Sequence, residues 1–341
     1  MTPARTWLLV VGISAAAAAG VLALASALES RRPPSFQPAP IYKVDFHQHV
    51  GPATARNAMA LATSQGIRAL VNLAGGPAGE GLEEQVAAAS PYPERMLVFA
   101  GLDWAGCCGE EWAGRELARL ARARAAGARG LQVYLSADAA AARLAADSPR
   151  LDPLWDLCAE AGFPVAVHLA RSPADGRAAL RQELARLAER RPRNAFVAQD
   201  FAGGASDPAE VGRLLDRLGN LHVDLAASLP ELGRHAEAAR AAVLAHPDRV
   251  LFGTDLQWLE GPDVKAVILG AGAPATAPEE VRRFFESTFR FLETRDREIP
   301  SPVPALGSWS LEGLGLPPEV LVRVYHRNAE RLLGLPPGGG R

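Results

Sequence analysis

The sequence predicts an α/β fold in which eight parallel strands close into a (β/α)8 TIM barrel. Apolar, β-rich runs alternate with alanine-, arginine- and leucine-rich stretches, which gives eight strand-then-helix units. Such alternation predicts a parallel sheet, and eight units favour a closed barrel. An open, doubly wound sheet is the alternative, but no Gly-x-Gly-x-x-Gly follows the first strand. The predicted strands cover residues 42–46, 69–72, 96–101, 130–134, 165–169, 195–199, 221–224 and 250–253.

The first 28 residues are predicted to be a signal peptide or a membrane anchor. Residues 1–5 are basic, and residues 7–27 are apolar and uncharged, which suits a segment of about 20 residues that enters a membrane. The small-x-small pattern at residues 25–27 is typical of signal peptidase sites. We expect export to the periplasm or another extracytoplasmic location, with this segment either cleaved or retained. A proline-rich linker at 29–40 then leads to a single domain at 41–341.

A C-terminal helical extension is predicted beyond the eighth strand. Its helices cover residues 279–293 and 318–333, and a proline-rich loop joins them. That loop could fold over the mouth of the barrel, or it could pack as an ordinary surface loop.

Composition and charge bound the classes of function. The chain of 341 residues has 48% hydrophobic residues and a formal net charge of −2, which is a globular profile without the basic excess of nucleic-acid-binding proteins. We expect a small-molecule substrate and no nucleic-acid partner, and a homodimer is left open. The three cysteines, Cys107, Cys108 and Cys158, are neither a disulfide framework nor spaced as a zinc clip.

The candidate site begins with Asp45-Phe46-His47-Gln48-His49, at the end of the first predicted strand. Side chains at positions i and i+2 of a strand point the same way, so His47 and His49 present two imidazoles on one face. Two neutral imidazoles form half of a site for zinc or a similar metal. A structural imidazole that bonds to the backbone is the alternative for each histidine.

Further polar residues stand where other predicted strands end, and the chemistry of a parallel barrel sits at that edge. His168 follows strand five and Asp255 follows strand eight, so with His47 and His49 they predict a mononuclear metal site with room for water. Asp255 could also take a proton from that water. Zinc is the expected ion, with manganese or iron as alternatives. Gln132 and Asp224 are candidate substrate contacts, although Asp224 could equally cap a loop as a structural carboxylate. The remaining histidines are read as structural or surface residues: His222, His235, His246 and His326.

These motifs together resemble the amidohydrolase-related superfamily, in its amidohydrolase 2 branch. The resemblance rests on residues 45–49, 167–170 and 251–255, and on two late stretches at 313–318 and 328–333. It covers about residues 41–334 and implies a distorted (β/α)8 barrel with one divalent metal, often zinc. That branch holds hydrolases of esters, lactones or amides. It also holds non-oxidative decarboxylases similar to aminocarboxymuconate-semialdehyde decarboxylase.

The sequence departs from this family in two places. Relatives usually carry a histidine after strand six, where this chain has Asp200, or Gln199 if the register shifts by one residue. Asp200 is therefore a candidate catalytic residue, an extra metal ligand, or a sign of lost activity, and Gln199 is a candidate substrate contact. Relatives often carry a lysine at Gln132, and a glutamine cannot be carbamylated to bridge two metals. The sequence therefore predicts a site for one metal ion rather than two.

Three functions are compatible with the sequence. The first is an exported, metal-dependent hydrolase of a small carbonyl compound. The second is a metal-dependent decarboxylase, which needs a cationic clamp for a substrate carboxylate, and Arg171 and Arg234 are available for it. The third is a barrel that binds a metal or ligand without catalysis, for which Asp200 is the main support.

Overall fold

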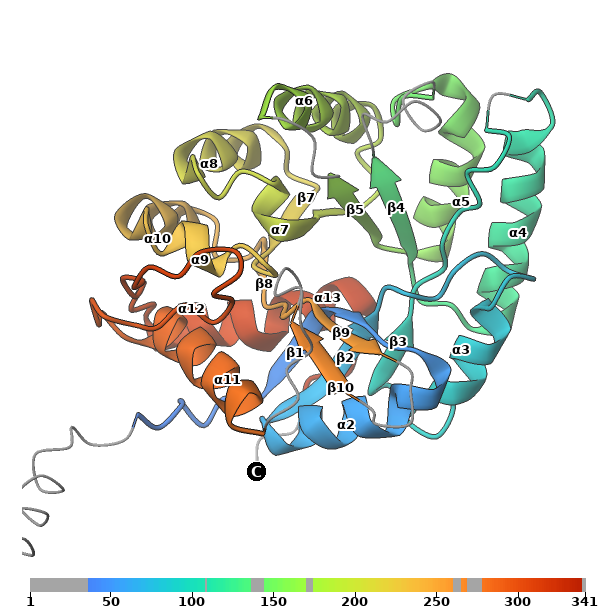
Figure 1. Ribbon diagram of the computed structural model, residues 1–341. Helices are drawn as coiled ribbons and strands as arrows, with labels where there is room; N and C mark the ends of the chain where they lie inside the picture. Colours follow the sequence, from blue (N-terminus) through green and yellow to red (C-terminus); the bar gives the residue numbers. More distant parts are fainter. Residues whose placement is uncertain are drawn as a thin grey trace, which may run out of the picture. The chain divides into compact units, whose positions relative to one another are not determined.

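The computed structural model describes residues 36–107, 109–135, 144–169, 174–259, 265–268 and 278–338 (Figure 1). The chain divides after Pro38, and the following description concerns the unit Ala39–Arg341. The predicted signal or anchor segment lies outside the described residues, as do most of the linker and Arg171. Within the described part of the chain, no helix has both the length and the apolar character that crossing a membrane requires.

Eight parallel strands form the barrel, and each contains residues of one predicted run. They are β1 (Lys43–His49), β2 (Ile67–Asn72), β3 (Met96–Val98), β4 (Leu131–Leu135), β5 (Val165–Leu169), β6 (Phe196–Ala198), β7 (Leu221–Asp224) and β8 (Val250–Leu251). Parallel pairing joins β1 to β2 and β3, and it also joins β4 through β8 in chain order.

Hydrogen bonds close the two groups of strands into one ring. Beyond β3, Ala100 pairs with Leu131, and the Gln132 N–H donates to the Ala100 carbonyl at 2.7 Å. On the other side, the Phe46 N–H donates to the Phe252 carbonyl at 2.9 Å, which joins the end of β8 to β1. The predicted (β/α)8 barrel is confirmed.

Helices flank the strands on the outside, as Figure 1 shows. They are α2 (Ala55–Ser64), α3 (Leu82–Ala89), α4 (Trp112–Ala126), α5 (Asp152–Ala161), α6 (Ala174–Arg190), α8 (Pro208–Arg217) and α10 (Ala236–Ala245). Shorter helical turns occur at η1 (Pro52–Thr54), η2 (Pro149–Leu151), α7 (Gln199–Ala202) and α9 (Leu229–Leu232).

The strands carry buried apolar side chains on both faces of the sheet, as expected for a parallel sheet covered by helices. Val44 and Phe46 of β1 belong to one buried cluster that also holds Ala166 of β5, Val197 of β6 and Leu251 of β8. Because these residues come from opposite sides of the ring, the cluster fills the barrel interior.

A hairpin that the sequence analysis did not predict follows β8. Its strands, β9 (Leu256–Leu259) and β10 (Lys265–Ile268), pair antiparallel, and β9 runs parallel to the end of β1 through Gln48 and His49. The segment after β8 thus pairs with β1 twice, first at Phe252 and again in β9. Asp255 lies between these two stretches, where the backbone turns with φ 54°.

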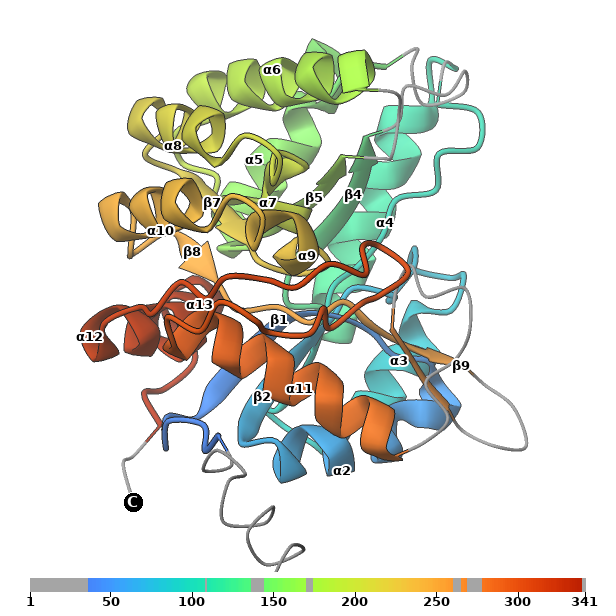
Figure 2. The same ribbon diagram turned by 60° about the vertical axis from the view of Figure 1, so that its left-hand side comes forward.

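The C-terminal extension begins with α11 (Pro278–Glu293), which matches the first predicted helix. The second predicted helix is divided into α12 (Pro318–Val322), the π-helical turn η3 (Arg323–Arg327) and α13 (Asn328–Leu333). A π-turn widens a helix by one residue per turn, which periodicity over so short a segment does not reveal. The loop between α11 and α12 packs on α9, where the Trp309 Nε1–H donates to the Pro230 carbonyl at 2.7 Å (Figure 2).

Candidate functional site

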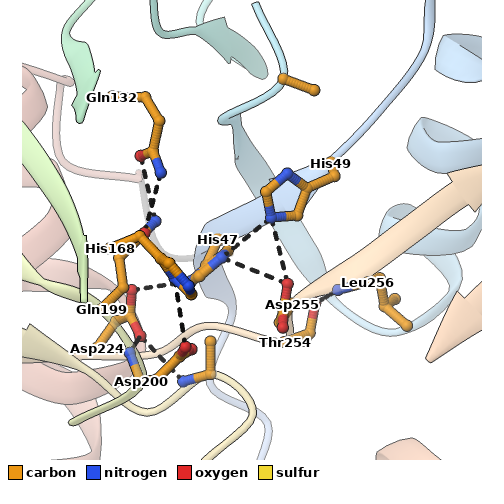
Figure 3. Close-up of polar contacts among 12 residues, drawn as sticks. His47, His49, Gln132, His168, Gln199, Asp200, Asp224, Thr254, Asp255 and Leu256 are labelled. Carbon is orange, nitrogen blue, oxygen red and sulfur yellow. Dashed lines mark hydrogen bonds and ion pairs between the residues drawn. The ribbon is translucent and has the colours of Figure 1, made fainter. Parts of the chain in front are cut away.

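The polar residues of the strand ends meet at one end of the barrel, as Figure 3 shows. β1 supplies His47 and His49, β5 supplies His168, and β7 supplies Asp224. Asp200 follows β6, and Asp255 follows β8.

An irregularity in β1 makes this arrangement possible. Phe46 faces the barrel interior, so regular alternation would turn His47 outward. The pairing of β1 with β2 shifts register between Asp45 and Gln48, which brings two successive side chains to the interior. As a result, Val44 and Phe46 fill the core, while His47 and His49 face the mouth above it.

Asp45 holds this irregular segment in place, and the sequence analysis missed its role. It is fully buried, and its oxygens accept from the Thr254 hydroxyl at 2.6 Å, the Gln48 amide at 2.7 Å and the Thr254 N–H at 3.0 Å. Burial raises its pKa to about 6, although these hydrogen bonds oppose the shift. Its position as a carboxylate within an apolar strand was the feature of the sequence that could have indicated this structural role.

Three of the four predicted metal ligands meet directly. His47 Nε2 lies 3.2 Å from His49 Nε2, and Asp255 Oδ1 lies 3.3 Å from His49 Nε2 and 3.4 Å from His47 Nε2. One ligand atom from each residue lies within 4.8 Å of the others. Two imidazole nitrogens and a carboxylate oxygen are a donor set that zinc accepts.

The burial and hydrogen bonding of the Asp255 carboxylate show whether these residues fit a cation. The side chain is 2% exposed, and neither of its oxygens accepts a hydrogen bond from any residue that the structure describes. A buried carboxylate without donors is unfavourable unless a cation neutralises it. The residues therefore fit a divalent metal between His47, His49 and Asp255.

Asp224 stands behind His47. Its Oδ2 lies 3.0 Å from His47 Nδ1, while its Oδ1 accepts from the Asp200 N–H at 2.9 Å and the Ala226 N–H at 3.2 Å. A carboxylate on one ring nitrogen fixes the imidazole and directs the other nitrogen toward a metal. Burial lowers the pKa of His47, but the negative charges of Asp224 and Asp255 outweigh it and raise the pKa to about 10. These carboxylates thus favour a positive charge here, which a metal would supply by replacing the proton on Nε2. Asp224 is itself fully buried, and its predicted substrate contact stays a prediction.

His168 lies to one side of the three clustered ligands. Its Nδ1 is 3.5 Å from Asp200 Oδ2, and among the described residues it belongs to neither group of ligand atoms that lie within 4.8 Å of one another. Burial, followed by the charge of His47, lowers its pKa to about 4, so the imidazole is neutral at pH 7. Its place as a fourth ligand stays a prediction.

Asp200 occupies a strained segment. The label α7 covers a left-handed turn, with φ values of 55° at Asp200, 54° at Phe201, 56° at Ala202 and 60° at Gly203. Left-handed backbone costs roughly 1–2 kcal/mol for each residue other than glycine. Of the six such residues with positive φ in the described ranges, five lie beside the site: Asp200, Phe201, Ala202, Ala227 and Asp255. Strain of this kind collects at functional sites.

The two predicted glutamines bind each other. The Gln132 amide donates to Gln199 Oε1 at 3.0 Å, and the Gln199 amide donates back at 3.3 Å. Both are buried, and their substrate contacts stay predictions. Tyr134, which the sequence analysis passed over, is 44% exposed, and its ring lies 5.1 Å from that of His168.

A cavity of about 310 Å³ adjoins the site at Asp200. It lies among the segments that follow β5, β6 and β7, and Leu306 of the loop between α11 and α12 forms part of its wall. The predicted clamp residue Arg234 does not line it, because Arg234 stacks over Trp309 and pairs with Glu231 at 3.4 Å.

Residues 31–335 match the sequence profile of the amidohydrolase family, Amidohydro_2. The chain belongs to the amidohydrolase family. It is thus a metal-dependent enzyme of the superfamily that holds hydrolases and decarboxylases, as the resemblance implied. No curated protein matches this amidohydrolase.

Solved structures of low sequence identity share its fold. An amidohydrolase from Burkholderia multivorans with bound zinc is 15% identical, with a TM-score of 0.56 over 86% of this chain and 100% of that one. A 2,6-dihydroxybenzoate decarboxylase in complex with 2,6-dihydroxybenzoate is 16% identical, with a TM-score of 0.53 and coverage of 86% and 100%. A probable 2-pyrone-4,6-dicarboxylic acid hydrolase from Acinetobacter baumannii with bound citric acid is 12% identical, with a TM-score of 0.53 and the same coverage.

Proposed function

We propose that this amidohydrolase is a mononuclear, metal-dependent hydrolase of a small ester, lactone or amide. The observation that carries the proposal is the buried Asp255 carboxylate, which faces two imidazole nitrogens and accepts no hydrogen bond from the described residues. The zinc bound to the amidohydrolase of the same fold supports zinc as the ion.

In this proposal His47, His49 and Asp255 would hold the metal, and His168 would complete the set. The metal would lower the pKa of a water molecule to roughly 7 and polarise the carbonyl oxygen of the substrate. Asp255 Oδ2 would accept a proton from the water as the water oxygen attacks the carbonyl carbon. It would pass this proton to the leaving oxygen or nitrogen when the carbonyl C–O or C–N bond breaks.

The two carboxylates behind the imidazoles act as positioning residues. Asp224 holds the Nδ1 side of His47, and Asp200 faces Nδ1 of His168 in the same way at 3.5 Å. Each carboxylate leaves Nε2 of its imidazole for the metal. Asp200, which replaces the histidine usual in relatives, thereby acts as a positioning residue for His168 in an active enzyme.

We also propose that the enzyme is exported and works outside the cytoplasm, either cleaved or anchored through residues 7–27. The basic start and the uncharged apolar run support this proposal. Fusion of residues 1–40 to a reporter that is active only after export tests it, with a fusion that begins at residue 29 as the control.

Metal analysis and turnover together test the proposed reaction. Protein purified without added metal should contain about one zinc per chain, and His49→Ala should lose it, whereas His235→Ala, at a partly exposed histidine outside the ligand cluster, should keep it. Zinc-loaded enzyme should hydrolyse members of an ester, lactone and amide panel. Turnover confined to a panel of aromatic acids, with release of CO2, would replace the hydrolase by a decarboxylase. Absence of metal binding would overturn both.

A further inference from the structure

The cavity beside Asp200 is lined by an arginine that pairs with no carboxylate in the part of the chain that the structure describes. Its walls include the acidic residues Asp200 and Glu231 and the basic residue Arg177. Glu231 lies 3.4 Å from Arg234 and 3.5 Å from His235, and Asp200 faces His168 at 3.5 Å. Glu231 is therefore paired with a cation, whereas Asp200 faces an imidazole that is neutral at pH 7.

Arg177 has no such partner. Its Nε is buried without a hydrogen bond, and one terminal nitrogen makes only a long hydrogen bond of 3.5 Å to the Gly203 carbonyl. No carboxylate among the described residues pairs with it. The other arginines of α6 each have a carboxylate: Arg181 with Glu210 at 2.9 Å, Arg186 with Asp147 at 2.6 Å and Arg190 with Asp152 at 2.7 Å.

A partly buried guanidinium without an anion is energetically unfavourable, because its lost hydration is not replaced. Guanidinium groups bind carboxylates with paired, charge-assisted hydrogen bonds, which lysine cannot reproduce. The unpaired arginine of α6 is also the one that lines the cavity next to the candidate metal ligands. These two facts together point to an anionic ligand rather than to a structural role.

We propose that Arg177 selects substrates by binding a carboxylate in the cavity that adjoins Asp200. This inference rests on the proposed function, since it assigns the cavity to the substrate of that site. The substrate is then a carbonyl compound that carries a separate carboxylate. Ser206, on the exposed rim of the same cavity, offers a second donor.

Binding of succinate to metal-depleted protein tests the site without catalysis. Arg177→Gln should lower the affinity measured by calorimetry at least tenfold, and Arg177→Lys should lower it less. Arg186→Gln, which removes an arginine of the same helix outside the cavity, should leave it unchanged. Thermal melting of each variant checks that it folds, and Arg177→Lys keeps the test open should Arg177→Gln unfold. Equal succinate affinity in the wild type and the folded Arg177 variants would overturn the inference.

A pair of esters separates this inference from the proposed function. Zinc-loaded wild type should hydrolyse monomethyl succinate with a kcat/KM at least tenfold above that for dimethyl succinate, and Arg177→Gln should abolish the preference. Hydrolysis of both esters without preference would overturn the role of Arg177 and leave the hydrolase standing. Succinate binding that depends on Arg177, without turnover of any ester, lactone or amide, would overturn the hydrolase and leave the anion site standing.

Discussion

At the scale of single residues, the site is organised by carboxylates that stand behind imidazoles. His47 is the central example, because Asp224 occupies its Nδ1 at 3.0 Å while its Nε2 faces His49 and Asp255. Asp224 is also tied to the backbone N–H groups of Asp200 and Ala226, so it links β7 to the turn after β6. The geometry of His47, His49 and Asp255 thus depends on Asp224, which lies outside that group of three.

Asp224→Asn should weaken zinc binding by about 10- to 100-fold, because the imidazole of His47 loses its charged support. Competition with a chromogenic chelator measures the affinity. Asp248→Asn, which removes an exposed carboxylate, serves as the control and should bind zinc like the wild type. An unchanged affinity in Asp224→Asn would show that Asp224 does not position His47.

His222 makes the stability of the protein depend on pH. It is buried, its Nδ1 has no partner among the described residues, and burial together with Arg331 and Arg249 lowers its pKa from 6.5 to about 4. The unfolded chain therefore binds a proton between pH 6.5 and pH 4 that the folded chain does not. As the pH falls from 6.5 to 4, the free energy of unfolding should decrease by about 3 kcal/mol through His222 alone, at 1.36 kcal/mol per pKa unit.

Urea denaturation at several pH values measures this loss. His222→Leu should reduce the slope between pH 6.5 and pH 4, while His235→Leu, at a partly exposed position, should not. His168 has a pKa lowered in the same direction and adds to the slope in every variant, so the comparison isolates His222. A wild-type slope in His222→Leu would contradict the prediction.

At the scale of elements, the turn after β6 shows what the site demands of the backbone. Phe201 and Ala202 adopt left-handed conformations without being glycines, and they carry the chain from the Asp200 carboxylate to Gly203. Ala198, four residues earlier, is equally buried but extended, with φ −78° and ψ 115°. The same substitution at the two alanines therefore isolates the cost of the left-handed turn.

Ala198→Gly should lower the free energy of unfolding by about 1–2 kcal/mol, because glycine removes a buried methyl group and loosens the unfolded chain. Ala202→Gly should be at least about 1 kcal/mol less destabilising, because glycine relieves the left-handed strain. Chemical denaturation of the two variants measures the difference. Equal losses would mean that the turn stores no strain at Ala202.

At the scale of the whole barrel unit, stability and chemistry lie at opposite ends. The C-terminal segment packs on the β8 side, where the Phe252 N–H donates to the Val324 carbonyl at 2.9 Å, and Ala329 and Leu333 join the interior cluster. Asn328 is fully buried, and its amide donates at 2.8 Å to the carbonyls of Pro247 and Val250, which flank the start of β8. In parallel barrels that end serves stability, and the other end holds the site.

Asn328→Ala should lower the free energy of unfolding by about 2–3 kcal/mol, because two carbonyls lose their donor. Arg327→Ala, at the exposed neighbouring residue, should change it by less than about 0.5 kcal/mol. Zinc affinity of folded Asn328→Ala should equal that of the wild type. A large loss of zinc affinity in this variant would contradict the separation of the two ends.

The sequence by itself predicted the barrel and singled out His47, His49 and Asp255, whose ligand atoms the structure brings together, while their binding of a metal stays a prediction. These follow from local signals: strand-like runs alternate with helical ones, and polar residues stand at predicted strand ends. The same signals placed His168, Asp200 and Asp224 near the site, although not their contacts. These local signals did not predict the β9–β10 hairpin, because the turn at Asp255 interrupts the strand pattern before the chain pairs with β1 again.

Only the tertiary structure decided which of these residues meet. The register shift in β1 turns His47 inward, Asp224 locks it, and His168 stands apart beside Asp200. It alone distinguished Arg177 from its neighbours on α6, since an unpaired charge is defined by what surrounds it. The physical reason is that periodicity acts between adjacent residues, whereas pairing, burial and strain depend on segments brought together from distant parts of the chain.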